Sequence, residues 1–442
     1  METICAISTA YGTGGIAVIR VSGSESISVV DGLFTGRHRL SDTPANSIRY
    51  GQIARDGEVL DEVLCSVFRA PHSFTGEDVV EIACHGSLYI QQTLLQWLVD
   101  AGARMARAGE FTQRAFLNGK MDLAQSEAVA DLIAAQTKAE KDLALSQLRG
   151  SVSNELGVLR ERLLHFTSLV ELELDFADHE ELEFADRSEL KSLAGEIARK
   201  LQALVHSFRT GNAIRNGISV AIIGAPNVGK STLLNALLGE QRAIVSDIQG
   251  TTRDTIEDTI VIEGILFRLI DTAGIRETSD TIEQMGVERS RQAIERAQIV
   301  VYVSEPNPVP SLQGRELEGI KGTVIEVLNK CDQSPITNHQ SPIIPISAKH
   351  GDIESLKREL VRVARASMTT EGVMLSNARH YEAVSRALEA IVRVQQGLED
   401  GLSGELLSLD LQDCLAALGE VTGQITNQEV LSNIFSKFCI GK

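Results

Sequence analysis

The sequence predicts a multidomain chain: an α+β domain at the N-terminus, an all-helical domain, and an α/β domain with a mainly parallel sheet inserted into the helical domain. Three observations predict this fold class. Proline is missing from 72–225 and from 346–442, so long helices are permitted on both sides of the middle of the chain. That middle, about 217–367, alternates apolar strand-like runs with helical stretches, which is typical of a parallel α/β sheet. The first 118 residues carry short apolar runs beside glycine-rich turns, which indicates an α+β domain.

The domain boundaries follow from where these patterns change. We expect the N-terminal domain over 1–118, the first helical part over 119–212, the α/β domain over 213–368 and the second helical part over 369–442. Such an insertion is tolerated because domain termini often lie close together. The length of 442 residues and the hydrophobic content of 43% suit about three globular domains.

In the N-terminal domain we expect strands in TICAIST, GIAVIRVSG, DEVLCSVF and DVVEIACHG. A turn that contains Gly12, Gly14 and Gly15 separates the first two strands. A glycine-rich turn can bind a dinucleotide, but that fingerprint requires a helix after the turn, and a strand pattern follows here. We therefore assign no dinucleotide to this turn.

The helical domain is predicted from runs without helix-breaking residues. Residues 120–149 and 158–194 lack both glycine and proline, and 376–438 is rich in Leu, Ala, Glu and Gln. Asp186, followed three residues later by Glu189, predicts a capping box where a new helix begins.

In the α/β domain we expect strands in SVAIIGA, ILFRLIDTAG, IVVYVSE, TVIEVLNK and IIPISAK, with helices at 230–239 and 283–297. The proline-rich SEPNPVP begins the loop 304–313, which we expect to lie away from the sequence motifs.

Charge and cysteine content restrict the classes of function. The formal net charge is −18, and the stretch 121–212 alone carries 10 basic and 17 acidic residues. Bulk charge thus gives no reason to expect nucleic-acid binding, and any RNA contact would need a local basic patch. The six cysteines are scattered, which indicates neither a disulfide framework nor a structural metal. No apolar run approaches the ~20 residues of a membrane span, and METICAIST is not a signal-peptide pattern, so we expect a cytoplasmic chain.

GAPNVGKS at 224–231 matches the phosphate-loop pattern GxxxxGK[ST] between a predicted strand and a predicted helix. In that context backbone N–H groups face the phosphates, Lys230 balances the β/γ-phosphate charge, and Ser231 ligates Mg²⁺. Thr252 in GTTRD can reach Mg²⁺ and the γ-phosphate, and DTAG at 271–274 suits metal and γ-phosphate contacts.

NKCD at 329–332 predicts guanine as the base. Asp332 can accept hydrogen bonds from guanine N1–H and its 2-amino group, a pattern that adenine does not offer. Asn329 can meet the other edge of the base, Lys330 can lie over its plane, and the loop 347–349 can offer an N–H to guanine O6. Four motifs in this order, each at a strand end, predict a Ras-like P-loop G domain that binds GTP and GDP.

Ile275 follows DTAG, where many such GTPases carry a glutamine that orients the attacking water. Isoleucine cannot hold a water, so two possibilities stay open. The protein could be a slow switch that awaits an arginine from an activating protein. Alternatively, the Asn227 amide could join phosphate oxygens and carbonyls of 246–251 around a K⁺ ion, which would supply the missing charge.

The chain resembles the MnmE (TrmE) family of tRNA modification GTPases, in the TrmE-Era-EngA-like group, over essentially its whole length. The resemblance lies in TAYGTGGIAVIRVSG, SFTGEDVVEIACHG, GEFTQRAFLNGKMDLAQSEAVADLI, the GTPase motifs and the terminal FCIGK. It implies a homodimer held through the N-terminal domains and a K⁺-stimulated GTPase activated when two G domains meet. With the flavoprotein MnmG (GidA), in a heterotetramer, it would add a carboxymethylaminomethyl-type group to C5 of the wobble uridine of certain tRNAs.

The resemblance also implies metal ligands, namely Asn227 with the backbone of Ser246, Ile248 and Thr251 for K⁺, and Ser231 with Thr252 for Mg²⁺. Glu283 would orient the attacking water, so Ile275 would be tolerated; without the family, an acid there would be an ordinary solvated helix start. Lys230 and Asn227 complete the expected catalytic set. Motifs and resemblance together assign GTP contacts to Asn227, Val228, Gly229, Lys230, Ser231, Thr232, Ser246, Asp247, Ile248, Gln249, Gly250, Thr251, Thr252, Asp271, Thr272, Ala273, Gly274, Asn329, Lys330, Asp332, Ser347, Ala348 and Lys349.

The family's N-terminal domain binds a tetrahydrofolate derivative, in a 5-formyl or 5,10-methylene form, as the one-carbon source. The matching positions are Arg20, Glu81, Lys120 and Lys442. A carboxylate suits the pteridine's amino-pyrimidine edge and cations suit the glutamate tail, although each residue alone would be read as a surface charge. Cys439 matches a cysteine proposed as catalytic, and a small buried hydrophobe is an equal interpretation.

Two other functions remain open from the residues alone. An Era-type GTP-dependent RNA-binding or ribosome-assembly switch would share the G motifs, but such proteins carry a basic module after the G domain, whereas 369–442 is acidic. A folate enzyme with a regulatory GTPase is the third possibility.

Overall fold

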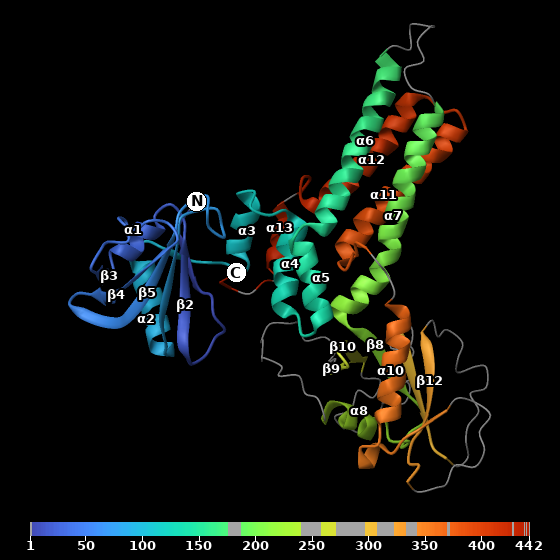
Figure 1. Ribbon diagram of the computed structural model, residues 1–442, viewed down its shortest axis with the longest axis horizontal. Helices are drawn as coiled ribbons and strands as arrows, with labels where there is room; N and C mark the ends of the chain where they lie inside the picture. The colour runs from blue at the N-terminus through green and yellow to red at the C-terminus, as the bar shows by residue number, and fades with distance from the viewer. Residues whose placement is uncertain are drawn as a thin grey trace, which may run out of the picture. The chain divides into compact units, whose positions relative to one another are not determined.

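The computed structural model (Figure 1) describes residues 2–175, 187–239, 258–270, 297–306, 322–332, 343–368, 372–426, 428–436, 438 and 440–441. The chain divides into two compact units. The first comprises Met1–Ala130, Gln147–Asn154 and Ala416–Lys442, and the second comprises Asp131–Ser146 and Glu155–Leu415. Among the described residues, no helix is both long enough and apolar enough to cross a membrane.

The first unit contains a seven-stranded sheet in the order β3-β4-β5-β6-β2-β1-β7. Its strands are β1 (Ile4–Ile7), β2 (Gly14–Ser22), β3 (Phe34–Gly36), β4 (Ser47–Arg55), β5 (Glu58–Phe68), β6 (Val79–Gly86) and β7 (Arg104–Met105). Neighbouring strands are antiparallel except β1 and β7. The strand that starts at Gly14 confirms that no helix follows the glycine-rich turn.

One face of this sheet packs against α1 (Ser26–Asp31) and α2 (Leu88–Asp100). Side chains alternate along β6, so Ile82 is fully buried in the core with Leu94 of α2, while Glu81 lies on the opposite face. That opposite face therefore presents polar side chains from β2 and β6.

The rest of the first unit brings the C-terminal residues onto the sheet domain. It contains α3 (Glu110–Leu117), most of α4 (Leu123–Ala134) and α13 (Gln428–Phe435), and α3 packs against α13. Ile440 forms a β-bridge with Ala108. Gly441 has φ of +96° and approaches β1 so closely that a Cβ would lie 2.0 Å from Ile7 O, so this position needs glycine.

The helical part of the second unit consists of α5 (Lys138–Leu148), α6 (Ser151–Asp175), α7 (Arg187–Asn216), α11 (Ala378–Glu399) and α12 (Gly404–Thr422). Of these, α5, α6 and α12 extend across its borders. α7 packs along α11 (Figure 1). The run 120–149 is divided into α4 and α5, because Thr137 and Glu140 form a reciprocal cap at 3.2 and 2.9 Å that the sequence analysis missed. Asp186 of the expected capping box lies outside the described residues.

The α/β part of the second unit is a six-stranded sheet in the order β13-β12-β11-β8-β10-β9, parallel except for β9. Its elements are β8 (Ile218–Ile223), α8 (Lys230–Gly239), β9 (Asp258–Ile262), β10 (Ile265–Ile270), β11 (Ile299–Ser304), β12 (Thr323–Leu328), β13 (Ile344–Pro345) and α10 (Glu354–Ser367). The five predicted strands and the helix at 230–239 are confirmed. The helix expected at 283–297 lies outside the described residues except Ala297.

Candidate guanine-nucleotide site

The phosphate loop 224–229 joins β8 to α8, the context that GAPNVGKS predicts. Gly224 has φ of +147°, and a Cβ there would lie 2.2 Å from Val303 O on the neighbouring strand β11. Asn227 has φ of +64°, a left-handed conformation that non-glycine residues seldom adopt. Gly229 is also at a positive φ, +95°, so the loop depends on three unusual backbone positions after β8.

The Lys230 ammonium lies against the inside of this loop. Its Nζ donates hydrogen bonds to Gly224 O at 2.9 Å and Ala225 O at 2.8 Å. Burial lowers its pKa, because the surroundings solvate the positive charge poorly. A third N–H donor remains for an anionic partner such as a phosphate oxygen.

Asn329 connects the base-recognition segment to two other loops. The side chain is buried; its Nδ2 donates to Val228 O at 2.9 Å, and its Oδ1 accepts the Ala348 N–H at 3.0 Å. We expected this amide to meet the base directly. In the structure it holds the phosphate loop, the NKCD segment and the 347–349 loop together, and its second Nδ2 N–H stays available for the predicted contact with the base.

Asp332 presents the carboxylate that is expected to read guanine. The Ser347 hydroxyl donates to its Oδ1 at 2.8 Å, and His350 Nε2 lies 3.4 Å from Oδ2. The hydrogen bond from Ser347 is the main reason why the pKa of Asp332 lies below its usual value. The group is therefore ionised at neutral pH and can accept two N–H donors on one edge of a base.

Glu305 is a site residue that the sequence analysis missed. Lys330 has φ of +63°, and its Nζ contacts both Asn227 O at 2.9 Å and the Glu305 carboxylate at 2.5 Å. We expected the loop 304–313 to lie away from the motifs, and for Glu305 this was wrong. Because β11 and β12 are parallel neighbours, the residue after β11 reaches the segment after β12. An acid directly after a strand of the sheet was the available signal.

Two of the expected metal ligands lie in the described part of the chain. The Asn227 amide and the Ser231 hydroxyl are exposed, and neither makes a hydrogen bond to another described residue. Neutral oxygen atoms of these kinds are suitable ligands for K⁺ and Mg²⁺. The expected site residues outside the described part are Ser246, Asp247, Ile248, Gln249, Gly250, Thr251, Thr252, Asp271, Thr272, Ala273, Gly274, Glu283, Cys439 and Lys442, and so is Ile275.

Two of the expected folate residues, Arg20 and Glu81, lie on the open face of the first unit's sheet. Arg20 and Glu81 face each other across β2 and β6, with Arg20 Nη2 2.8 Å from Glu81 Oε1. The Arg20 guanidinium lies 5.2 Å from the ring centroid of Phe74 and 5.6 Å from that of Phe111. Lys120 donates to Pro71 O at 3.0 Å, in the same loop that carries Phe74. Phe111 is fully buried, whereas Phe74 and the charged pair are partly exposed, and a partly exposed charged pair beside a ring suits a flat, polar heterocycle.

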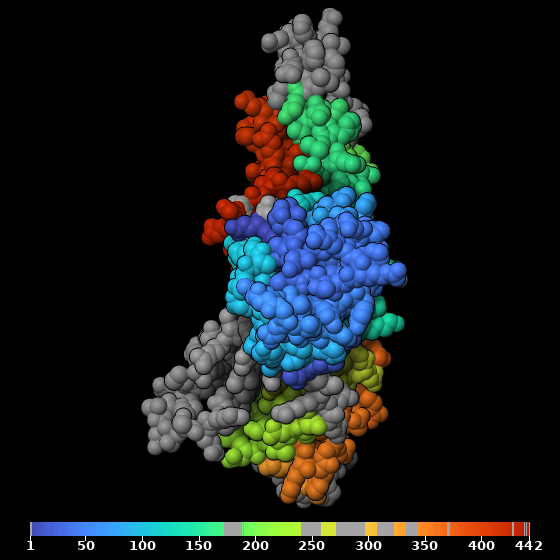
Figure 2. All heavy atoms as spheres, turned by 90° about the vertical axis from the view of Figure 1, so that its left-hand side faces the viewer, coloured from blue at the N-terminus to red at the C-terminus, as the bar shows by residue number. Residues whose placement is uncertain are grey.

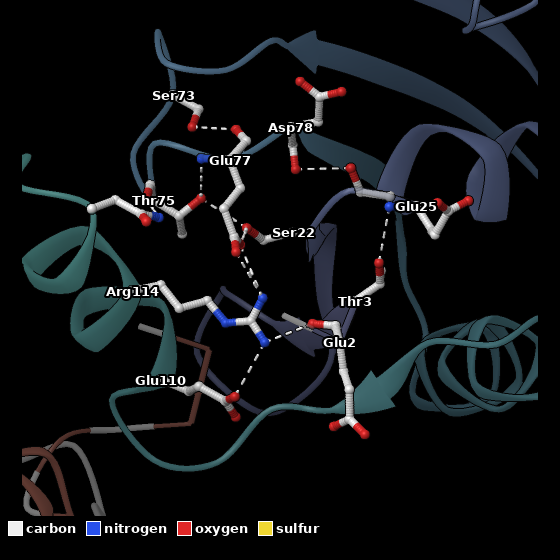
Figure 3. Close-up of polar contacts among 12 residues, drawn as sticks. Glu2, Thr3, Ser22, Glu25, Ser73, Thr75, Glu77, Asp78, Glu110 and Arg114 are labelled. Carbon is white, nitrogen blue, oxygen red and sulfur yellow. Dashed lines mark hydrogen bonds and ion pairs between the residues drawn. The ribbon is translucent and has the colours of Figure 1, made fainter. Parts of the chain in front are cut away.

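A buried ionic network fixes the loop and helix that carry these rings (Figure 3). Arg114 of α3 donates to Glu77 Oε2 at 2.9 Å and to Glu2 O at 2.7 Å, and it also contacts Glu110. Ser22 of β2 donates to the same Glu77 carboxylate at 2.8 Å. Because the two parts are joined by charge-assisted hydrogen bonds, the loop and α3 keep a fixed position against β2.

Two family models match successive parts of this chain. Residues 3–120 match the family described as GTP-binding protein TrmE N-terminus, and residues 123–439 match the MnmE helical domain. The chain is 52% identical over 468 residues to a tRNA modification GTPase MnmE of Parabacteroides distasonis, covering 100% of both chains. It is 50% identical to the protein of that name from Bacteroides thetaiotaomicron, over 100% of this chain and 99% of that one. It is 48% identical to the protein of that name from Porphyromonas gingivalis, over 100% of this chain and 98% of that one. An Era variant of Aquifex aeolicus bound to GDP and AlF₄⁻ matches 39% of this chain and 66% of its own, with 28% identity and a TM-score of 0.26.

Proposed function

The chain belongs to the MnmE (TrmE) family of tRNA modification GTPases and is a GTP hydrolase, and from this premise we propose that it acts on the wobble uridine of tRNA. In this proposal it works with the flavoprotein MnmG to add a carboxymethylaminomethyl-type group at C5, in the cytoplasm. The joining of the phosphate and base loops through Asn329 is the observation that best supports GTP as the driving nucleotide. The Era-type alternative is less favoured, because both family matches lie outside that class.

We infer that Mg²⁺ and K⁺ assist the hydrolysis. Ser231 would hold Mg²⁺ together with Thr252, and Asn227 would hold K⁺ with the backbone of Ser246, Ile248 and Thr251. When bound, the two cations would neutralise charge that develops on the phosphate oxygens. The chain's own residues keep the phosphate loop in place, and Glu283 is proposed to orient the water.

The potassium proposal is tested by GTP turnover in matched K⁺ and Na⁺ buffers. The wild-type chain should turn over faster in K⁺, and Asn227→Ala should lose that difference. Asn216→Ala, which changes an exposed asparagine at the end of α7, is the matched control and should keep the K⁺ preference. Equal wild-type rates in the two salts would exclude the cation mechanism.

The tRNA proposal is tested in cells. Deletion of the gene should remove the C5 modification at the wobble position, as measured by mass spectrometry of digested tRNA. The wild-type gene should restore it and an Asp332→Asn gene should not. Normal modification after deletion would refute the proposal.

We further propose a tetrahydrofolate derivative as the ligand of Arg20, Glu81, Lys120 and Lys442, and a homodimer formed through the sheet domain. The partly exposed Phe74 ring beside Arg20 supports the first proposal. Exposed apolar side chains on β2 and β4, including Ile16 and Tyr50, support the second. Titration calorimetry with 5-formyltetrahydrofolate would test the folate proposal, and the absence of a binding heat would count against it. Sedimentation equilibrium would test the homodimer, and the mass of a monomer would count against it.

A further inference from the structure

The arginines of the sheet domain separate into two groups. Residues 2–120 contain nine arginines. Five of them form ion pairs with Asp or Glu: Arg20, Arg55, Arg104, Arg107 and Arg114. The other four, which have no acidic partner among the described residues, are Arg37, Arg39, Arg49 and Arg69.

These four arginines lie in, or contact, one segment, the loop between β3 and β4. Arg37 and Arg39 belong to the loop and are exposed, together with His38. Arg49 of β4 and Arg69, just after β5, are partly buried and contact the same loop. We call this group of four the arginine edge. It lies beside β3, the edge strand at the left of Figure 1, on the domain shown in blue in Figure 2.

The loop is held in a defined conformation. The buried Thr43 hydroxyl donates to Arg39 O at 2.9 Å and accepts Arg49 Nε at 3.1 Å. Arg69 Nη2 donates to Ser41 O at 2.7 Å. Each guanidinium has five N–H donors, so most donors of Arg49 and Arg69 remain for another partner.

Three carboxylates near the four arginines reduce their positive charge only in part. Asp31 is occupied by the loop itself, since it accepts the Leu40 N–H at 2.7 Å and the Ser41 hydroxyl at 2.8 Å. Asp42 is exposed. Asp78 accepts the Ala70 N–H at 2.8 Å, beside Arg69. Four arginines against these three acids leave a local positive excess on a chain whose net charge is −18.

We propose that the arginine edge binds the phosphate backbone of tRNA. Planar guanidiniums without acidic partners suit phosphate oxygens, and a fixed loop lowers the entropy cost of binding. A polyanion is attracted to such a patch even when the whole protein is acidic, because salt screens charges beyond about 8–10 Å. This inference rests on the proposed function for the identity of the RNA.

The test is a salt titration of tRNA binding by the full-length chain. Fluorescence anisotropy with a labelled tRNA transcript that carries a wobble uridine gives Kd at several KCl concentrations. The double variant Arg37→Ala/Arg39→Ala should weaken binding roughly tenfold near 0.1 M salt. It should also reduce the slope of log K against log salt by about 1 to 2, since each lost phosphate contact removes about one. Asp42→Asn should tighten binding.

The matched control is Arg362→Ala/Arg365→Ala, which removes two exposed arginines from α10. It should leave the slope unchanged, and both double variants should keep the wild-type melting temperature and the GTP turnover measured without tRNA. An unchanged slope in the first variant, or equal losses in both, would overturn the arginine edge while leaving the proposed function intact. A wild-type chain that does not bind tRNA at low salt would count against the proposed function as well.

Discussion

Replacing Glu305 by alanine would remove the carboxylate that holds Lys330 beside the phosphate loop. Lys330 Nζ lies 2.5 Å from Glu305 and 2.9 Å from Asn227 O. Both side chains of the ion pair are 36% exposed, so solvent screens it and it contributes roughly 0.5–1 kcal/mol. Because about 1.4 kcal/mol corresponds to a tenfold change in Kd, GDP affinity should fall about two- to fivefold.

The measurement is a titration with a fluorescent GDP analogue at fixed Mg²⁺. Glu305→Gln, which keeps an acceptor oxygen but loses the charge, should show a smaller loss than Glu305→Ala. Glu359→Ala is the control, because it removes an acid from an ion pair on α10 away from the loops of the site. It should bind GDP as the wild-type chain does.

A second readout separates positioning of Lys330 from recognition of the base edge. Inosine diphosphate lacks the 2-amino group that Asp332 is expected to bind, so Asp332→Asn should lower the preference for GDP over IDP. Glu305→Ala should weaken both nucleotides equally. The reasoning fails if Glu305→Ala binds like Glu359→Ala, or if its loss is confined to GDP.

Two further outcomes follow from contacts in each unit. Burial opposes ionisation of Glu110, but hydrogen bonds and charges of the neighbouring arginines lower its pKa to about 2. The ionised Glu110 therefore contributes its full share of stability above about pH 4.5, and this share is lost as the pH falls toward 2. The free energy of unfolding in urea, measured against pH, should show this dependence. Glu110→Gln should make the dependence smaller. In the phosphate loop, Gly224→Ala places a Cβ 2.2 Å from Val303 O, at a residue with positive φ. GDP affinity should therefore fall roughly tenfold or more in the same titration. The control is Gly239→Ala, whose Cβ would meet nothing within 4 Å and which should bind GDP normally. A flat pH profile or a Gly224→Ala variant with normal affinity would contradict these two expectations.

The sequence predicted the parallel strands of the α/β domain because their signals are local. Each is an apolar run, most of them end at a motif, and the phosphate loop pattern specifies both the strand before it and the helix after it. β9 was missed although TIVIEGILF contains a two-residue turn, Glu263–Gly264, with φ of +47° and +78°. Its hairpin with β10 is antiparallel, which the expectation of alternating strands and helices did not include.

The contacts between motifs were less predictable than the motifs themselves. Residues 227–232, 329–332 and 347–349 were named from sequence, and the structure brings these segments together. The contact of Glu305 depends on which strands are neighbours, and the arginine edge depends on which arginines find acidic partners. Both are consequences of long-range pairing, which residue types and spacing do not specify.

The same long-range pairing makes the base loop and the phosphate loop one structural unit. Asn329 holds Val228 O, and the next residue, Lys330, holds Asn227 O, so two consecutive carbonyls of the phosphate loop are fixed by two consecutive residues after β12. Asn227 is in a left-handed conformation, which costs free energy and persists only where contacts of this kind stabilise it. The direction of its amide, the proposed ligand of K⁺, therefore depends on residues expected to recognise the base. In the proposed mechanism, recognition of guanine and placement of the proposed K⁺ ligand would therefore share these same two contacts.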